Sequence, residues 1–179
     1  MIQVLDKSFE IFIPRDDIDR EIQSLAATLN EVYSGKDVVF LAVLNGAFMF
    51  ASDLMKELNL DCEISFVKMS SYKGVNTTGK VEELIGLNTD IEGKEVVIIE
   101  DIVDSGYTID KIISLIEDKG ASSIKVCTLL YKPDAFKGVT RPDFVGFTIP
   151  NAFVVGYGLD YNQKGRNLDA IYQIRDSKQ

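Results

Sequence analysis

Hydrophobic positions recur along the chain with two different periods, and the two periods alternate. In residues 16–33 the apolar side chains return at helical spacing, which predicts an amphipathic helix with Asp16 as its N-cap and Gly35 as its stop. Residues 48–58 and 109–116 indicate two further helices, and Gly120 ends the second of them.

Short runs of β-branched and aliphatic residues separate these helices. After their first residues, Asp37 and Glu95, the ranges 37–44 and 95–99 are continuously apolar, which is typical of strands covered on both faces. Residues 70–80 are polar and are expected to form a loop. The other expected strands span residues 62–69, 81–87, 124–130 and 144–149, with short strand-like pieces between 154 and 174.

Strands that alternate with helices imply βαβ units, and therefore an α/β fold with a twisted, mostly parallel sheet flanked by helices. In such sheets ligands bind beyond the carboxyl ends of the strands, where the strand order reverses. Candidate chemistry is therefore expected in the loops that follow strands. No repeat or Pro/Gly-rich linker interrupts the pattern, so residues 1–179 are expected to form a single domain.

The composition excludes several classes of function. The chain has 19 Lys plus Arg against 28 Asp plus Glu, no His and two Cys, and its formal net charge is −9. This excludes His-based catalytic triads and four-ligand zinc cages, and it argues against non-specific nucleic-acid binding. The longest apolar run, residues 38–51, is too short to cross a bilayer, and the N-terminus has no signal-peptide hydrophobic region. A cytoplasmic protein that binds neither nucleic acid nor a membrane is expected.

The most informative segment follows the apolar run 95–99, where acidic and hydroxyl side chains are expected in the turn into a helix. Residues 104–108 can wrap backbone N–H groups and hydroxyls around an anion at the helix N-terminus. Glu100 and Asp101 can hold ribose hydroxyls or a hydrated magnesium ion. In the simpler alternative, Asp104 and Ser105 only cap the helix while Glu100 and Asp101 are solvated. A cap needs one such residue, however, and this segment has several.

With this segment in view, the sequence resembles a purine phosphoribosyltransferase. Residues 97–108 resemble the binding motif for 5-phosphoribosyl-1-pyrophosphate (PRPP). The resemblance implies the type I phosphoribosyltransferase-like fold, with a flexible flap over residues 70–80 and a small hood region. Segment 153–161, followed by Arg166, narrows the resemblance to the 6-oxopurine branch of the family. The segments that resemble the hypoxanthine(-guanine) phosphoribosyltransferase family are 44–50, 71–72, 130–132, 142–147 and 153–161.

This family transfers ribose 5-phosphate from PRPP to N9 of hypoxanthine or guanine and releases pyrophosphate. The resemblance therefore implies an enzyme of purine salvage that uses Mg²⁺ as cofactor. It implies Asp104 as the general base near purine N7, a role a carboxylate can fill in a chain without histidine. Glu100 and Asp101 would hold the ribose diol, directly or through magnesium. The implied 5′-phosphate-binding residues are Ser105, Gly106, Tyr107 and Thr108.

For pyrophosphate, the resemblance implies contacts from Asn45, Gly46, Ser71, Tyr72 and Arg166. Many family members have Lys-Gly where this chain has Asn45 and Gly46, in a loop with a cis peptide bond. The asparagine amide can still donate a hydrogen bond but brings no charge. The resemblance therefore implies a contact between the backbone of this loop and pyrophosphate, but no lysine-like role for Asn45.

For the purine, the resemblance implies that Lys132 donates a hydrogen bond to the 6-oxo group. Because a lysine cannot accept a hydrogen bond, Lys132 would favour an oxo purine over the amino group of adenine. Phe153 would stack on the base. Taken alone, Lys132 would be a surface lysine in a turn and Phe153 a core aromatic. Asp160 joins Glu100 and Asp101 as an implied metal ligand. The implied purine-binding residues are Ile102, Lys132, Phe153, Val154 and Asp160.

Two alternatives stay open. A 6-oxopurine transferase selective for xanthine or guanine would differ in its initial rates with the three bases. A PRPP-sensing regulator that binds RNA or DNA should have a basic face and an added nucleic-acid module, whereas this chain is acidic. The expected partners are small-molecule substrates, and family precedent implies a homodimer or homotetramer.

Overall fold

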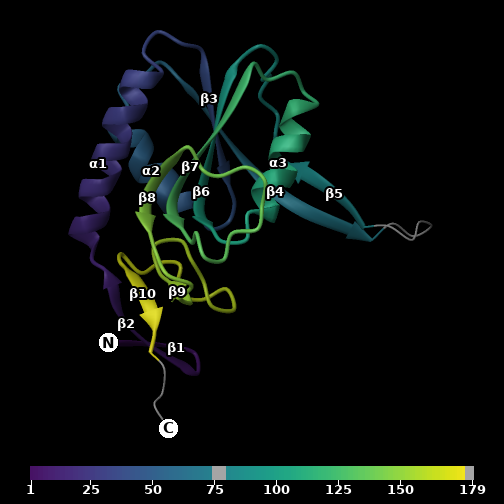
Figure 1. Ribbon diagram of the computed structural model, residues 1–179. Helices are drawn as coiled ribbons and strands as arrows, with labels where there is room; N and C mark the ends of the chain where they lie inside the picture. The colour runs from purple at the N-terminus through teal and green to yellow at the C-terminus, as the bar shows by residue number, and fades with distance from the viewer. Residues whose placement is uncertain (74–79, 176–179) are drawn as a thin grey trace.

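The computed structural model describes residues 1–73 and 80–175, with the backbone alone over residues 70–73 and 80–85. Its central sheet contains β3 (Val38–Val43), β4 (Glu63–Lys73), β5 (Lys80–Ile85), β6 (Glu95–Val103), β7 (Ser123–Tyr131) and β8 (Phe144–Thr148). The strand order is β5-β4-β3-β6-β7-β8 (Figure 1). All neighbours pair in parallel except β5, which runs antiparallel to β4.

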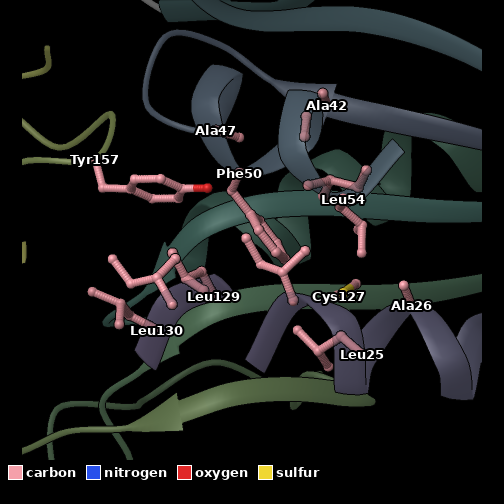
Figure 2. Close-up of a cluster of buried hydrophobic side chains, with 14 of the residues drawn as sticks. Leu25, Ala26, Ala42, Ala47, Phe50, Leu54, Cys127, Leu129, Leu130 and Tyr157 are labelled. Atoms are coloured by element: carbon pink, nitrogen blue, oxygen red, sulfur yellow. The ribbon is translucent and has the colours of Figure 1, made fainter. Parts of the chain in front are cut away.

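Three helices cover the two faces of this sheet: α1 (Arg15–Val32), α2 (Phe48–Glu57) and α3 (Tyr107–Glu117). α1 and α2 share one buried cluster with Phe40 of β3, and α3 shares another with the next residue, Leu41. Figure 2 shows the first cluster, in which Leu25, Phe50 and Cys127 come from α1, α2 and β7. Because side chains alternate along a strand, an unbroken apolar strand is buried on both faces.

The predicted twisted, mostly parallel sheet flanked by helices is confirmed. None of the helices within residues 1–73 and 80–175 is long and apolar enough to cross a membrane. α1 begins one residue before the predicted N-cap Asp16, because the extended Pro14 precedes the helix and Asp16 lies in its first turn. The predicted cap at Asp16 is therefore wrong, although the helix itself is confirmed.

The predicted hood is a second sheet of four antiparallel strands, made from both ends of the chain. It contains β1 (Ile2–Val4), β2 (Lys7–Ile13), β9 (Val154–Val155) and β10 (Ile171–Ile174), in the order β1-β2-β10-β9. It lies beyond the ends of β7 and β8 (Figure 1). The sequence pattern predicted no strand before residue 16, although β2 pairs both with its neighbour β1 and with the distant β10.

The predicted loop over residues 70–80 is partly wrong, because its ends are strands. Ser71 pairs with Glu82 and Tyr72 with Val81 in the antiparallel ladder of β4 and β5. Figure 1 shows this hairpin projecting away from the body of the sheet. Residues 74–79 of the predicted flap, and the side chains of Ser71 and Tyr72, lie outside the described residues.

The strand order reverses between β3 and β6. After β3 the chain adds β4 on one side of it, and then returns to add β6 on the other side. Ligands of open α/β sheets bind at such a point, beyond the carboxyl ends of the strands. The loop after β3 carries Asn45 and Gly46, and the turn after β6 carries Asp104, Ser105 and Gly106.

Candidate active site

β6 is longer than predicted, and this moves two predicted site residues out of the turn. Glu100 pairs with Thr128 and Val103 with Tyr131 of β7, so Glu100 and Asp101 lie in the strand. The expectation that they occupy the turn is wrong, because the ladder with β7 continues through polar residues. Both carboxylates therefore stand at the carboxyl edge of the sheet on a rigid element.

Glu100 is a buried carboxylate, and only 8% of it is exposed. Its Oε2 atom has no hydrogen-bond partner among the described residues. Burial, and then the charge of Asp101, raise the pKa of Glu100 well above its ordinary value. An acceptor left unpaired in this way costs about 1–3 kcal/mol. A bound hydroxyl or a hydrated cation would satisfy it, whereas the alternative of a solvated Glu100 is wrong.

Asp101 packs against the loop that follows β3. A Cβ atom built on Gly46 would lie 1.8 Å from Oδ2 of Asp101, so a larger residue at this position would require the Asp101 side chain to move. Burial raises the pKa of Asp101 to about 6, although backbone hydrogen bonds and the charge of Arg166 oppose the shift. The peptide bond between Leu44 and Asn45 is cis. The loop after β3 and the end of β6 therefore meet in one place.

The turn after β6 forms a small cavity at the N-terminus of α3. Gly106 is the N-cap residue with φ of +84°, a left-handed conformation that favours glycine. The Asp110 N–H donates the first helical bond to the Gly106 carbonyl at 3.0 Å. The amides before Asp110 therefore face the helix end, as an anion site requires. The cavity is lined by Glu100, Ile102, Val103, Asp104, Ser105, Gly106, Thr108 and Ile109.

The simpler interpretation of this turn as a helix cap is not supported. Gly106, and neither Asp104 nor Ser105, occupies the cap position of α3, which has no side-chain cap hydrogen bond. Tyr107 is the first residue of α3 and is 56% exposed. Of the four predicted phosphate-binding residues, Ser105, Gly106 and Thr108 line the cavity.

The loop between β7 and β8 supports this turn from the outside. The Lys137 N–H donates to the Ser105 carbonyl at 3.0 Å. The Asp110 carboxylate of α3 accepts hydrogen bonds from the N–H groups of Val139 at 2.8 Å and Thr140 at 2.9 Å. Asp110 was not among the residues predicted from the sequence, because nothing in the local pattern distinguishes it from other helical carboxylates.

Lys132 reaches the site from the end of β7. Its side chain is 8% exposed, and its Nζ atom donates to Oδ2 of Asp104 at 2.8 Å. Lysine is rarely buried unless it is paired. The alternative of a surface lysine in a turn is therefore wrong. Because β6 and β7 are parallel neighbours, residues that follow their carboxyl ends come together.

Phe153 and Val154 connect the site to the hood. Val154 is buried in β9. Phe153 is 45% exposed, and its ring centroid lies 5.8 Å from that of Tyr161 and 6.3 Å from that of Phe9. Phe153 is therefore not a buried core aromatic. Its ring contacts those of Tyr161 and Phe9, and nearly half of the residue remains exposed.

Asp160 and Arg166 form an ion pair beside the carboxylate edge. Oδ1 of Asp160 lies 2.6 Å from Nη2 of Arg166, and Arg166 also donates to the Gly158 carbonyl at 2.8 Å. Both charges act on the pKa of Asp101, in opposite directions. A Cβ atom on Gly158 would lie 2.0 Å from the carbonyl oxygen of Gly46. The segment after β9 therefore closes against the loop after β3.

The three predicted metal ligands do not form a complete cage. Among residues 1–73 and 80–175, no group of three or more His, Cys, Asp or Glu side chains is arranged to hold a metal ion. Magnesium usually keeps several waters and uses one or two carboxylates together with substrate phosphates. Glu100, with its unpartnered Oε2, and Asp101 are oxygen donors that fit such a shared site.

Comparisons with known proteins identify relatives of this chain. The phosphoribosyl transferase domain family matches residues 14–162. The chain is 41% identical over 168 residues to a hypoxanthine phosphoribosyltransferase of Escherichia coli K12, which covers 92% of this chain and 94% of that protein. It is 40% identical over 163 residues to a hypoxanthine-guanine phosphoribosyltransferase of Bacillus subtilis, covering 90% and 91%.

A solved structure of a hypoxanthine phosphoribosyltransferase from Staphylococcus aureus matches with a TM-score of 0.85 and 38% identity, and the match covers 93% of this chain and 91% of that one. The chain therefore belongs to the phosphoribosyltransferase family and, within it, to the hypoxanthine(-guanine) phosphoribosyltransferases.

Proposed function

We propose that this protein transfers ribose 5-phosphate from PRPP to N9 of hypoxanthine and of guanine, giving IMP or GMP and pyrophosphate in purine salvage. The observation that carries the proposal is the pair of Lys132 and Asp104, joined at 2.8 Å where β7 and β6 end. A 6-oxopurine presents a 6-oxo acceptor and an N7 proton side by side. A buried ammonium donor next to a carboxylate acceptor matches both.

In the proposed reaction, purine N9 attacks C1′ of the ribose and the bond from C1′ to the pyrophosphate oxygen breaks. Asp104 takes the proton from N7 as general base. Lys132 donates to the 6-oxo group, Phe153 stacks on the base, and Ile102 and Val154 complete the purine site. Positioning and charge stabilisation supply most of the rate, because the sugar passes through an oxocarbenium-like state.

The ribose phosphate would occupy the carboxyl end of β6. Ser105, Gly106, Tyr107 and Thr108 would bind the 5′-phosphate through N–H and hydroxyl donors at the helix end. Glu100 and Asp101 would hold the ribose diol or the Mg²⁺ ion. The unpartnered Oε2 of Glu100 supports this role. When bound, Mg²⁺ supplies neutralising charge between these carboxylates and the polyanionic donor.

Pyrophosphate would leave on the side of the β3 loop. The backbone of Asn45 and Gly46 and the guanidinium of Arg166 would contact it. The short distance between Gly158 and Gly46 supports this grouping. Ser71 and Tyr72, on the β4–β5 hairpin, would close over the reacting centre and exclude water. Asp160 would serve both the purine site and a second magnesium ion.

The test is an initial-rate assay with PRPP, Mg²⁺ and each of hypoxanthine, guanine, xanthine and adenine. We expect turnover with hypoxanthine and guanine, and little with adenine, because Lys132 cannot accept a hydrogen bond from the 6-amino group. A preference for xanthine would instead support the selective alternative. Binding of RNA or DNA without any turnover would support the regulator.

A further inference from the structure

Tyr157, which is outside the predicted site residues, connects the segment after β9 to helix α2. The residue is fully buried, with φ of +49°, between Gly156 and Gly158 with φ of +99° and +98°. Its hydroxyl donates to Oδ2 of Asp53 on α2 at 2.5 Å. Figure 2 shows the ring extending toward α2, with its hydroxyl oxygen directed toward Phe50. A left-handed tyrosine is unusual, so the fold holds this side chain in place at a cost.

Two cations also bind the Asp53 carboxylate and fix its position. Nη2 of Arg15 lies 2.8 Å from Oδ2 of Asp53, and Nζ of Lys56 lies 2.5 Å from Oδ1. The Arg15 guanidinium also lies 5.3 Å from the centroid of the Tyr157 ring. Burial and the bond to Asp53 raise the pKa of Tyr157 well above its ordinary value, so its hydroxyl stays a donor.

Asp53 and Tyr157 both lie on segments that adjoin the candidate site. α2 begins directly after the loop that contains Asn45 and Gly46. Gly158, the residue after Tyr157, packs on Gly46 so closely that a Cβ atom would lie 2.0 Å from its carbonyl oxygen. The Arg166 guanidinium donates to the Gly158 carbonyl. The bond from Tyr157 to Asp53 therefore connects the segment after β9 to the helix that follows the β3 loop.

We propose that Tyr157 is a positioning residue for the pyrophosphate group, because its bond to Asp53 fixes the β3 loop and the segment after β9 at the spacing that PRPP requires. The proposal rests on the proposed function of these two segments. Tyr157 contacts no reacting atom. Loss of its hydroxyl should therefore raise the KM for PRPP, and for pyrophosphate in the reverse reaction, with little change in kcat.

The first experiment compares two tyrosine hydroxyls. Tyr157→Phe keeps the ring and its packing, and we expect both KM values to rise about tenfold, as for a lost hydrogen bond to a charged group, with kcat within about threefold. Tyr33→Phe is the matched control. Tyr33 is a buried tyrosine of the same core cluster, but it lies just before β3, at the amino ends of the strands. The KM values of Tyr33→Phe should equal those of the native protein.

The second experiment changes the acceptor. Asp53→Asn keeps an oxygen that can accept the Tyr157 hydroxyl, so its KM for PRPP should stay near native, whereas Asp53→Leu should reproduce the tenfold rise. The double variant Tyr157→Phe/Asp53→Leu should show no further rise, because both changes break one connection.

Native activity with unchanged KM values in Tyr157→Phe, or an equal rise in Tyr33→Phe, would overturn the positioning role alone. A native protein that forms no nucleotide from PRPP would overturn the proposed function, and the positioning role with it.

Discussion

The ammonium of Lys132 and the carboxylate of Asp104 meet at 2.8 Å across the ends of two neighbouring parallel strands. The lysine is buried, whereas 48% of the aspartate side chain is exposed. The carboxylate is therefore accessible to an incoming ligand, and the buried ammonium is held beside it. A donor and an acceptor are in place before a purine binds, so little reorganisation is needed during the reaction.

Asp104→Ala should remove the general base and leave PRPP binding largely intact. We expect turnover to fall by roughly 10²–10⁴-fold, with a change of less than about threefold in the dissociation constant of PRPP measured by calorimetry. Asp134→Ala, which removes an exposed carboxylate from the loop after β7, is the control and should keep the native rate. A near-normal rate in Asp104→Ala would exclude this residue as the base.

Lys132→Ala should weaken the preference for oxo over amino purines. The loss of a charged hydrogen bond predicts a fall of about 10–100-fold in kcat/KM for hypoxanthine, whereas the low rate with adenine should change little. Lys125→Ala is the control, because Lys125 lies on β7, the strand that precedes Lys132, and also pairs with an aspartate, Asp143, at 2.8 Å. An unchanged ratio of hypoxanthine to adenine rates in Lys132→Ala would refute its role in discrimination.

The sequence pattern predicted most of the fold, because buried strands and amphipathic helices have strong periodic signals. It failed where a distant partner decides the structure. β2 pairs with the distant β10 as well as with its neighbour β1, and β6 continues to Val103 beside β7, which continues to Tyr131. Neither β10 nor β7 is visible in a local window around these strands. The extension of β6 matters most, since it places Glu100 in a strand as a buried carboxylate and not in the predicted turn.

Gly158→Ala should damage both stability and PRPP binding. The new Cβ atom would lie 2.0 Å from the Gly46 carbonyl oxygen, and φ at this position is +98°. Gly35→Ala separates the steric clash from the backbone strain. Gly35 also has a positive φ, +72°, but nothing lies within 4 Å of its Cβ position. We expect Gly35→Ala to cost only the backbone strain of about 1–2 kcal/mol, with normal kinetics.

In contrast, Gly158→Ala should melt at a lower temperature than Gly35→Ala and raise the KM for PRPP at least about tenfold. Thermal melts and initial rates of the two variants side by side provide the comparison. Equal melting temperatures and a native KM would contradict the close packing of the two loops.

Asp53 should make stability depend on pH. Burial opposes its ionisation, but hydrogen bonds from Lys56 and Tyr157 and the charge of Arg15 prevail and lower its pKa. A lowered pKa stabilises the folded protein above the unfolded value of about 3.9 and loses this effect as pH falls through the folded value. Asp53→Asn should therefore melt below the native protein at pH 7, and the gap should narrow below about pH 4. A gap that is constant from pH 7 to pH 3 would contradict the ionised cluster.

The candidate site was only partly visible in the sequence. The order of acidic and hydroxyl residues after β6 identified the anion-binding turn, because that turn is local. The burial of Lys132 and the connection from Tyr157 to Asp53 depend on residues 28 and 104 positions apart. Asp110, which holds the loop after β7, likewise has no local signal. Such residues can be recognised only when the strands that bring them together are known.

The most direct measurement is a calorimetric titration of PRPP, with Mg²⁺ present, into the native protein and the Thr108→Val variant. Thr108, in the first turn of α3, lines the cavity formed by the turn after β6, so we expect saturable binding to one site in the native protein. The variant should bind about tenfold more weakly. A folded native protein that takes up no PRPP, and that forms no nucleotide when hypoxanthine is added, would contradict the assignment of this turn as the sugar-phosphate site.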